Sequence, residues 1–230
     1  MKGIRLNFIV EGQTEEAFVN RVLNPHLANS AIWISARCVM TGHKGGIKYR
    51  GGITSYERAK RDITQWIKED QNKDARFTTM FDLYGLPDDF PGYEDSAKAS
   101  DPYERVGTLE RALEEDIGDP RFIAYIQLHE FEALLLSDPQ KLDLQFYDRT
   151  GEIERLVIMV NRFSSPELID DGIDTSPSKR IIAEIPEYAG MKTSAGPIIA
   201  QRIGLHTLRT KCEHFTRWLD KLESLMQNND

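Results

Sequence analysis

Apolar segments typical of buried strands alternate with segments of helical periodicity through the first half of the chain. The strand-like segments cover residues 4–10, 32–40, 77–83 and 122–128, and the first is nearly continuous in apolar side chains. Runs of this kind are typical of strands whose two faces are both covered. The alternation therefore predicts an α/β fold, with a parallel sheet of about four strands and helices on both faces.

The second half of the chain shows helical patterns without a further strand-like segment. The clearest of its helices lies near the C-terminus, where one face carries Phe215, Trp218, Leu219, Leu222, Leu225 and Met226. We expect an α/β domain over residues 1–137 and a helical C-terminal extension, packed on it, over residues 138–230. Between the second strand and the next helix, the glycine-rich residues 41–52 predict a flexible loop, and Thr54 and Glu57 predict a capping box.

Composition narrows the classes of protein to which the chain can belong. A net charge of −8 disfavours a protein that coats nucleic acid, because phosphate binding needs concentrated positive charge. The two cysteines lack the spacing of a disulfide framework or a zinc site. No segment approaches the roughly 20 apolar residues of a membrane span, and the N-terminal segment lacks the apolar core of a signal peptide. We therefore expect a cytoplasmic protein with no membrane partner.

Charged residues are unevenly distributed along the chain. Lysine and arginine outnumber aspartate and glutamate over residues 37–76, and the reverse holds over residues 82–119. Two interpretations remain open. Each block is a solvated helix face, as most charge blocks are, or the two blocks form a basic groove beside an acidic metal pocket.

Three of the predicted strands are followed or ended by an acidic residue. Glu11 follows the first strand, Asp82 lies at the end of the third, and Glu130 follows the fourth, with Glu132 two residues further on. The carboxyl ends of parallel strands lie at one edge of a sheet, where such folds bind their ligands. Converging carboxylates repel one another unless a cation is present, and Mg²⁺ prefers oxygen ligands. The sequence therefore predicts a divalent metal site at this edge.

Glu15 and Glu16 lie in the first turn of the helix that follows Glu11. Acidic residues are favoured at helix starts by the helix dipole, so this position has an ordinary structural explanation. The alternative is that Glu15 takes part in a functional site beside Glu11. Both interpretations of Glu15 remain open at this point.

Three motifs carry a resemblance to a known family. They are residues 10–16 (VEGQTEE), 81–87 (FDLYGLP) and 129–135 (HEFEALL), supported by the stretches 177–180, 196–197 and 214–215. Together they resemble a Toprim-like family of uncharacterised bacterial proteins, domain of unknown function 4276. That family is distantly similar to the Toprim domains of topoisomerases, bacterial primases and the overcoming-lysogenisation-defect nucleases.

The resemblance implies a Toprim-like, Rossmann-like fold and phosphodiester chemistry with Mg²⁺ (or Mn²⁺). In Toprim domains a glutamate after the first strand and a later Asp-x-Asp bind the metal. Glu11 matches the glutamate, Glu15 resembles the paired glutamate of the nucleases, and Asp82 matches the first aspartate. Tyr84 stands where the second aspartate is expected, so that either the missing oxygen comes from Asp88, Asp89, Glu130 or Glu132 or metal binding is weakened.

The expected function is therefore that of a metal-dependent nuclease, in a setting such as bacterial defence against phage. Its catalytic residues would be Glu11, Asp82 and Glu130, and its metal ligands would be these three with Glu15 and Glu132. Nucleic acid would be bound by Lys44, Lys48, Arg50 and Lys179, with Lys192 as a further cation, although each of these is also explained as ordinary surface charge.

Two other residues near these motifs have open roles. Tyr84 would stack on a base or pack on Pro87, and His129 would orient Glu130 or simply end a strand.

The alternative to a nuclease is a non-catalytic subunit that binds or regulates, acting with a partner ATPase as the nuclease resemblance implies. The sequence contains no phosphate-binding loop of the Gly-x-x-x-x-Gly-Lys-Ser/Thr type. Nucleotide hydrolysis would therefore come from the partner.

Overall fold

The computed structural model describes residues 3–44, 47–50, 53–169 and 175–227, and for residues 40–44 and 47–50 it describes only the backbone. The strands are β1 (Ile4–Val10), β2 (Ile32–Cys38), β3 (Met40–Lys44), β4 (Ile47–Arg50), β5 (Ala75–Asp82), β6 (Phe122–Ile123) and β7 (Ile126–Gln127). The α-helices are α1 (Gln13–Phe18), α2 (Asn24–Ala28), α3 (Tyr56–Glu69), α4 (Tyr93–Ser96), α5 (Pro102–Ile117), α6 (Glu132–Leu135), α7 (Thr150–Val160), α8 (Pro177–Glu184), α9 (Lys192–Ile203), α10 (Leu205–Lys211) and α11 (Glu213–Glu223). Shorter helical turns are η1 (Val19–Leu23), η2 (Leu83–Gly85), η3 (Pro139–Leu144), η4 (Pro166–Leu168), η5 (Pro186–Gly190) and η6 (Ser224–Met226).

Five of the described strands form a parallel sheet in the order β2-β1-β5-β6, with β7 also paired to β5. The chain passes from β1 outward to β2, then crosses β1 to reach β5 and continues outward to β6. The direction of winding therefore reverses between β1 and β5. The predicted α/β class, with a parallel sheet of about four strands and a helical C-terminal part, is confirmed.

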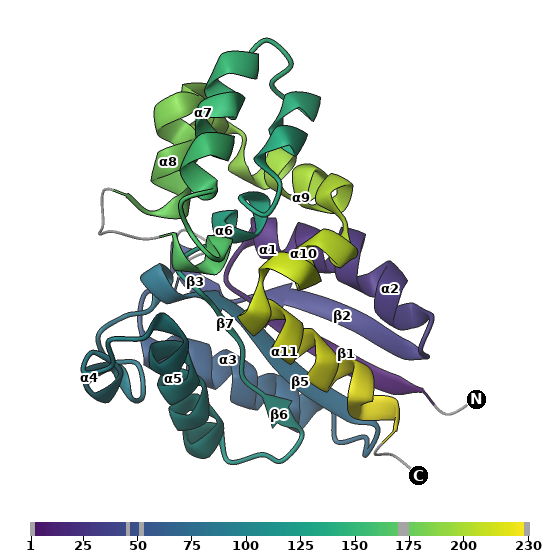
Figure 1. The fold of residues 1–230 in the computed structure, drawn as a ribbon. Coiled ribbons are helices and arrows are strands. Elements are labelled where there is room, and N and C mark those ends of the chain that lie inside the picture. The colour runs from purple at the N-terminus through teal and green to yellow at the C-terminus, as the bar shows by residue number, and fades with distance from the viewer. Residues whose placement is uncertain (1–2, 45–46, 51–52, 170–174, 228–230) are drawn as a thin grey trace.

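Hydrophobic cores lie on both faces of the sheet. One face packs against α3 and α5, and the other packs against α1, α2 and α11. The second core continues without a break into α7, α8, α9 and α10, which stand over the carboxyl ends of the strands (Figure 1). Residues from both sides of position 137 therefore share one core, while the division into domains at that position stays a prediction.

The prediction of a flexible loop over residues 41–52 is wrong for residues 41–44 and 47–50, and the rest of that segment lies outside the described residues. The chain forms an antiparallel hairpin of β3 and β4, in which His43 pairs with Lys48 and Lys44 pairs with Ile47. Thr41 and Tyr49 are residue types that strands favour, although glycines surround them. Pairing of the two strands supplies the backbone hydrogen bonds that a loop would leave to water.

Helix starts were predicted with mixed success. Asp101 caps α5 as expected, because its side chain accepts a hydrogen bond of 3.0 Å from the backbone of Tyr103. The capping box at Thr54 is not formed. The backbone N–H of Tyr56, at the start of α3, donates to Asp89 at 3.0 Å, so that the cap comes from a residue 33 positions away.

The helix predicted after Glu11 contains a π-helical turn, η1, between α1 and α2. Pro25 lies in the first turn of α2. Proline has no N–H to donate to the preceding turn, and a π-turn is one way in which a helix accommodates a lost hydrogen bond.

The fourth predicted strand, residues 122–128, is split into β6 and β7. The hydroxyl of Thr79 bonds both the N–H and the carbonyl of Tyr125, at 2.9 and 3.0 Å. The flanking N–H groups of Ala124 and Ile126 donate to Glu114 and Glu110 of α5, each at 2.9 Å. These side chains thus bond the backbone N–H and carbonyl groups that would otherwise pair with the neighbouring strand in a continuous ladder.

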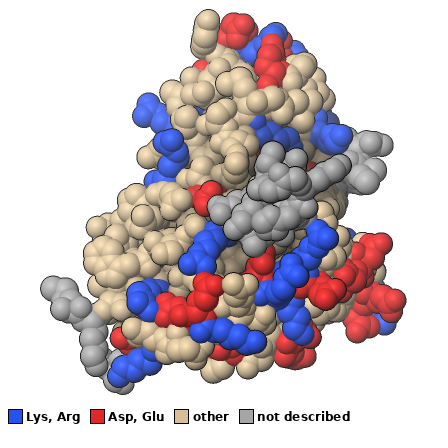
Figure 2. Space-filling model, turned by 180° about the vertical axis from the view of Figure 1, so that it is seen from behind, with Lys and Arg blue, Asp and Glu red and all other residues tan. Residues whose placement is uncertain are grey.

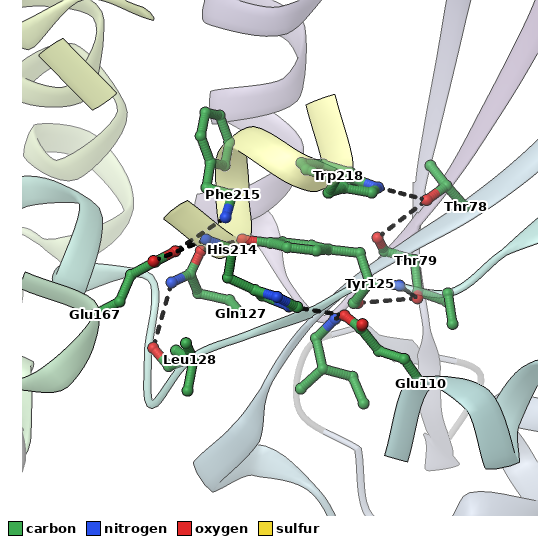
Figure 3. Close-up of polar contacts among 12 residues, drawn as sticks. Thr78, Thr79, Glu110, Tyr125, Gln127, Leu128, Glu167, His214, Phe215 and Trp218 are labelled. Carbon is green, nitrogen blue, oxygen red and sulfur yellow. Dashed lines mark hydrogen bonds and ion pairs between the residues drawn. The ribbon is translucent and has the colours of Figure 1, made fainter. Parts of the chain in front are cut away.

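Helix α11 docks on the sheet through a buried polar and aromatic network (Figure 3). The ring of Tyr125 stacks on Trp218, with centroids 4.0 Å apart, and on His214, with centroids 5.2 Å apart. The indole N–H of Trp218 donates to Thr78 of β5 at 3.0 Å. Glu167 accepts the N–H groups of His214 and Phe215 at the start of α11, at 2.9 and 3.0 Å.

His214 also contacts the acid that holds the break between β6 and β7. Its ring nitrogen lies 2.9 Å from Glu110. Burial lowers the pKa of His214, but the hydrogen bond and charge of Glu110 more than offset this, so the pKa is raised above its ordinary value. The C-terminal helix is therefore held to the sheet by the contact of His214 with Glu110 as well as by aromatic packing.

No helix among the residues that the structure describes is long and apolar enough to cross a membrane.

Candidate functional site

The acidic residues predicted at the strand ends lie at the switch point of the sheet. Glu11 follows β1, Asp82 ends β5, and these are the two strands between which the winding reverses. Parallel α/β sheets bind ligands in the crevice outside the carboxyl ends of such a pair of strands. The fold therefore places both residues where a ligand site is expected.

Glu11 and Asp82 are in direct contact. The backbone N–H of Asp82 donates to Oε2 of Glu11 at 3.0 Å. Gly85, in the turn η2 after β5, approaches the same carboxylate so closely that a Cβ at this position would lie 2.5 Å from Oε2. The absence of a side chain at Gly85 is thus a condition for the position of Glu11.

Glu15 points back toward the turn between β1 and α1. Its Oε2 accepts the N–H of Gly12 at 2.9 Å, and its side chain is buried. The helix start accounts for this hydrogen bond, but burial places the carboxylate among the other acids instead of in water. The structural interpretation of Glu15 is therefore confirmed, and its role as a metal ligand stays a prediction.

Glu130 reaches from the end of the split fourth strand to the C-terminal helices. Its Oε2 accepts the backbone N–H of Ser178 at 2.9 Å, in the first turn of α8. The positive end of the helix dipole favours a carboxylate at this place. Ser178 therefore contacts one of the acids. It lies in the stretch 177–180, which the sequence connected with the motifs only by resemblance.

Glu132 is buried and has two partners from the C-terminal helices. The hydroxyl of Tyr188 in η5 donates to its Oε1 at 3.1 Å, and the ammonium of Lys192 at the start of α9 lies 3.3 Å from the same atom. Lys192 was a candidate cation from the sequence. Tyr188 was missed, because nothing in its local sequence distinguishes it from a core tyrosine.

The five acids act on one another electrostatically. Burial raises the pKa of Glu15 to about 7, and the charges of Glu11 and Glu132 add to the rise. Burial, and then the charges of Glu15, Glu11 and Glu132, raise the pKa of Asp82 well above its ordinary value. The pKa of Glu11 is raised by burial and by Glu130, and that of Glu132 by burial and by Glu130 against the opposing charge of Lys192.

We call Glu11, Glu15, Asp82, Glu130 and Glu132 the acidic cluster. Its donor atoms are carboxylate oxygens, the ligands that Mg²⁺ and Mn²⁺ prefer. Oδ1 of Asp82 is buried without a hydrogen-bond partner, so it has full capacity to coordinate a cation. The residues present therefore fit a hard divalent ion.

The side chains of the acidic cluster act on one another electrostatically, but they do not stand in the geometry of ligands around an ion. Within residues 3–39, 53–169 and 175–227, no three His, Cys, Asp or Glu side chains stand at ligand geometry. Hydrogen bonds to the protein explain this arrangement, because Glu11, Glu15, Glu130 and Glu132 each have an oxygen bonded to a backbone or side-chain donor.

Tyr84 packs on His129. The two ring centroids lie 5.4 Å apart, and the N–H of Tyr84 donates to the carbonyl of His129 at 3.1 Å. His129 has a positive φ of 63°, a conformation that turns the chain sharply after β7. The structure thus gives Tyr84 a contact with His129, while its packing on Pro87 and its stacking on a base stay predictions.

Four residues were offered as sources of the missing oxygen, and two of them, Glu130 and Glu132, belong to the acidic cluster. Asp88 is exposed. Asp89 caps α3 and is exposed, whereas Glu130 and Glu132 act electrostatically on the other members. The two glutamates are therefore the better placed of the alternatives.

The predicted basic residues are only partly described. The backbones of Lys44, Lys48 and Arg50 lie in the β3–β4 hairpin, and their side chains lie outside the described residues. Lys179 is exposed in the first turn of α8, next to Ser178. On the rear face of the molecule, Lys and Arg side chains are interleaved with Asp and Glu instead of forming one uninterrupted patch (Figure 2).

Comparison with known families decides the relationship of the chain. A family model described as Domain of unknown function (DUF4276) matches residues 10–223. The chain belongs to this family. Searches of curated proteins and of solved structures found no match. The match begins at the end of β1 and ends in α11, so the matched range contains the acidic cluster of this chain and the helices that cover it.

A methyl group at Gly85 is expected to disrupt the cluster without disrupting the fold. In a Gly85→Ala variant, the Glu11 carboxylate must move away from the added Cβ and lose its hydrogen bond to Asp82. We expect the affinity for Mn²⁺, measured by titration calorimetry, to fall by about tenfold or more. Gly107→Ala is the control, because no atom lies within 4 Å of its added Cβ and alanine within a helix stabilises by about 0.5–1 kcal/mol. Equal affinities in the two variants would show that Glu11 does not bind the ion.

Proposed function

We propose that the protein catalyses metal-dependent cleavage of phosphodiester bonds in nucleic acid, with Mg²⁺ or Mn²⁺ bound at the acidic cluster. The observation that carries the proposal is the gathering of five carboxylates at the switch point of the sheet, four of them with pKa values raised by burial and mutual repulsion. Such an arrangement is unfavourable in the absence of a cation and is frequent at functional sites. The resemblance to Toprim domains supports the same chemistry.

In this proposal Glu11, Asp82 and Glu130 hold the ion, and Glu15 and Glu132 complete its surroundings. When bound, the ion supplies Lewis-acid stabilisation of the phosphate and lowers the pKa of the attacking water. Lys192 lies at the border of the cluster with its side chain 37% exposed, so its ammonium group is accessible to a phosphate. Its role is to neutralise charge that develops on the leaving group.

The hairpin and the start of α8 would hold the polymer on either side of the cluster. We assign Lys44, Lys48 and Arg50 to one side and Lys179 to the other, each binding backbone phosphates. Contacts of this kind are independent of base sequence and weaken as the salt concentration rises. A steep salt dependence of binding, reduced by Lys179→Ala, would support the assignment of Lys179.

The direct test is cleavage of plasmid, single-stranded DNA and RNA with Mg²⁺ or Mn²⁺. We expect cleavage by the wild-type protein and a loss of about 100-fold or more in Glu11→Gln and Asp82→Asn. Glu16→Gln is the matched control, because Glu16 is in the same helical turn as Glu15 but contacts Cys38 at 3.6 Å. Cleavage that survives both substitutions would exclude the acidic cluster as its source.

One observation favours a second candidate, a non-catalytic subunit that works with a partner ATPase. Lys192 pairs with the charge of Glu132, and the hydroxyl of Tyr188 donates a hydrogen bond to it, so the protein itself satisfies this carboxylate. Tyr84 stands where the resemblance to Toprim domains implies an acidic residue. Metal binding that is lost in Glu11→Gln, in a protein that cleaves none of the three substrates, would favour this candidate. A cytoplasmic location and a role in bacterial defence against phage belong to both proposals.

A further inference from the structure

Strand β2 forms one edge of the sheet, and Arg37 is the one charged residue along it. It pairs with β1 over all seven of its residues, without a bulge. Its sequence, IWISARC, contains neither proline nor lysine. Edges that are long, regular and free of these residues are ready to pair with another strand.

The direction of the backbone groups of β2 follows from the two ends of its pairing with β1. The carbonyl of Ala31 accepts from Ile4, and the N–H of Val39 donates to Val10. Backbone N–H and carbonyl groups point to alternate sides of a strand from one residue to the next, so those of Trp33, Ser35 and Arg37 face β1. The N–H and carbonyl groups of Ile34 and Ala36 therefore face outward, and no described backbone hydrogen bond reaches them.

The exposed side chains of β2 are complementary to those of a second copy of the same strand. Trp33 is 58% exposed, which is unusual for an indole, and the Arg37 side chain is 57% exposed. If two β2 strands pair antiparallel about an axis at Ser35, Trp33 lies opposite the partner subunit's Arg37. Arg37 already lies over an indole within its own chain, with its guanidinium 4.1 Å from the ring centroid of Trp66.

The same register also suits the backbone. Ile34 and the partner subunit's Ala36 become a hydrogen-bonded pair, because both face outward. Trp33 and the partner subunit's Arg37 become a non-hydrogen-bonded pair, the type in which side chains lie closest. A groove of about 400 Å³ is open on this face of the sheet edge, lined in part by Arg5, Trp33, Ser35, Arg37, Trp66 and Glu69.

From these observations we infer that the protein forms a two-fold symmetric dimer by antiparallel pairing of β2 with β2, giving one continuous sheet across both copies. An interface of this kind is isologous, so each contact occurs twice. The carboxyl ends of the two sheets face opposite directions, and each acidic cluster stays complete within its own chain. The dimer is therefore independent of the proposed catalysis.

The test is the oligomeric state, measured by analytical ultracentrifugation over a range of protein concentrations. We expect a dimer for the wild type. Trp33→Lys places two cations opposite each other at both ends of the interface, and Ala36→Pro removes an outward N–H without affecting the ladder to β1. We expect each to raise the dimer dissociation constant by about 30-fold or more. Tyr147→Lys, at an aromatic residue that is 85% exposed elsewhere, is expected to leave it unchanged.

Two further measurements distinguish strand pairing from general stickiness of Trp33. The double variant Trp33→Lys, Arg37→Glu restores opposite charges across the interface and is expected to recover much of the dimer. Amide hydrogen exchange at Ile34 and Ala36 is expected to be slow in the dimer and fast in Trp33→Lys, while exchange at Ser35 stays slow in both. A monomeric wild type, or a dimer that persists in Ala36→Pro with fast exchange at Ile34, would overturn the inference.

Discussion

Without divalent cations, the protein is expected to become less stable as the pH rises from about 5 to about 8. The pKa of Glu15 is about 7 in the folded protein against 4.5 for an ordinary glutamate. Between these values the folded state binds a proton that the unfolded state has released, so the free energy of unfolding falls as the pH rises. For Glu15 alone the loss is about 3 kcal/mol.

The other shifted groups act in the same direction. The raised pKa values of Glu11, Asp82 and Glu132 add to the loss. The raised pKa of His214 means that its stabilising charge is also lost as the pH rises through that pKa. A loss of about 3 kcal/mol corresponds to a Tm lower by about 6–12 °C for a chain of this size, which differential scanning calorimetry in a chelator would measure.

Mg²⁺ or Mn²⁺ is expected to reverse this loss at pH 8 and to have little effect at pH 5.5, because the ligands must be deprotonated to bind. Glu11→Gln should raise the Tm of the metal-free protein at pH 8 and abolish the effect of the metal. Glu16→Gln should do neither. A metal effect of equal size at both pH values would show that the acidic cluster does not hold the ion.

Trp218→Ala is expected to be the most destabilising single truncation in α11, by about 3–5 kcal/mol. The substitution removes the stacking partner of Tyr125 and the indole that bonds Thr78, and it leaves a cavity between α11 and the sheet. Because the core on this face continues from the sheet into the C-terminal helices, we expect one cooperative transition at a lower denaturant concentration, followed by circular dichroism and tryptophan fluorescence.

Tyr147→Ala is the control for this truncation. Its side chain is 85% exposed, so the free energy of unfolding should change by less than about 0.5 kcal/mol. If Trp218→Ala instead unfolded the C-terminal helices in a separate first transition, residues 138–230 would be an independent unit and not an extension of the same core.

The sequence predicted the features that depend on the chain locally. The alternation of apolar runs and helical segments predicted the parallel sheet, and the position of Asp101 predicted the start of α5. It also predicted which acids would come together. This was possible because all strands of a parallel sheet end at the same edge, so that Glu11, Asp82 and Glu130 are brought close by the topology alone.

Features that depend on residues distant in the sequence could not be predicted in the same way. Asp89 caps α3 across 33 residues, and the side chains of Thr79, Glu110 and Glu114 divide the fourth strand. Each of these contacts depends on the packing of a whole helix or loop. No local pattern around the partner residue indicates it.

The sequence by itself determined the parallel sheet and the convergence of carboxylates at its edge, because the period of apolar residues fixes the elements and their order fixes the shared edge. Only the tertiary structure decided how the acidic cluster is enclosed. Glu130 is held by α8 and Glu132 by Tyr188 and Lys192, since α8 and α9 fold back over the strand ends from more than 40 residues further along the chain. Burial by these helices raises the pKa of Glu132, and close packing of the whole cluster is the physical reason that a cation is expected there.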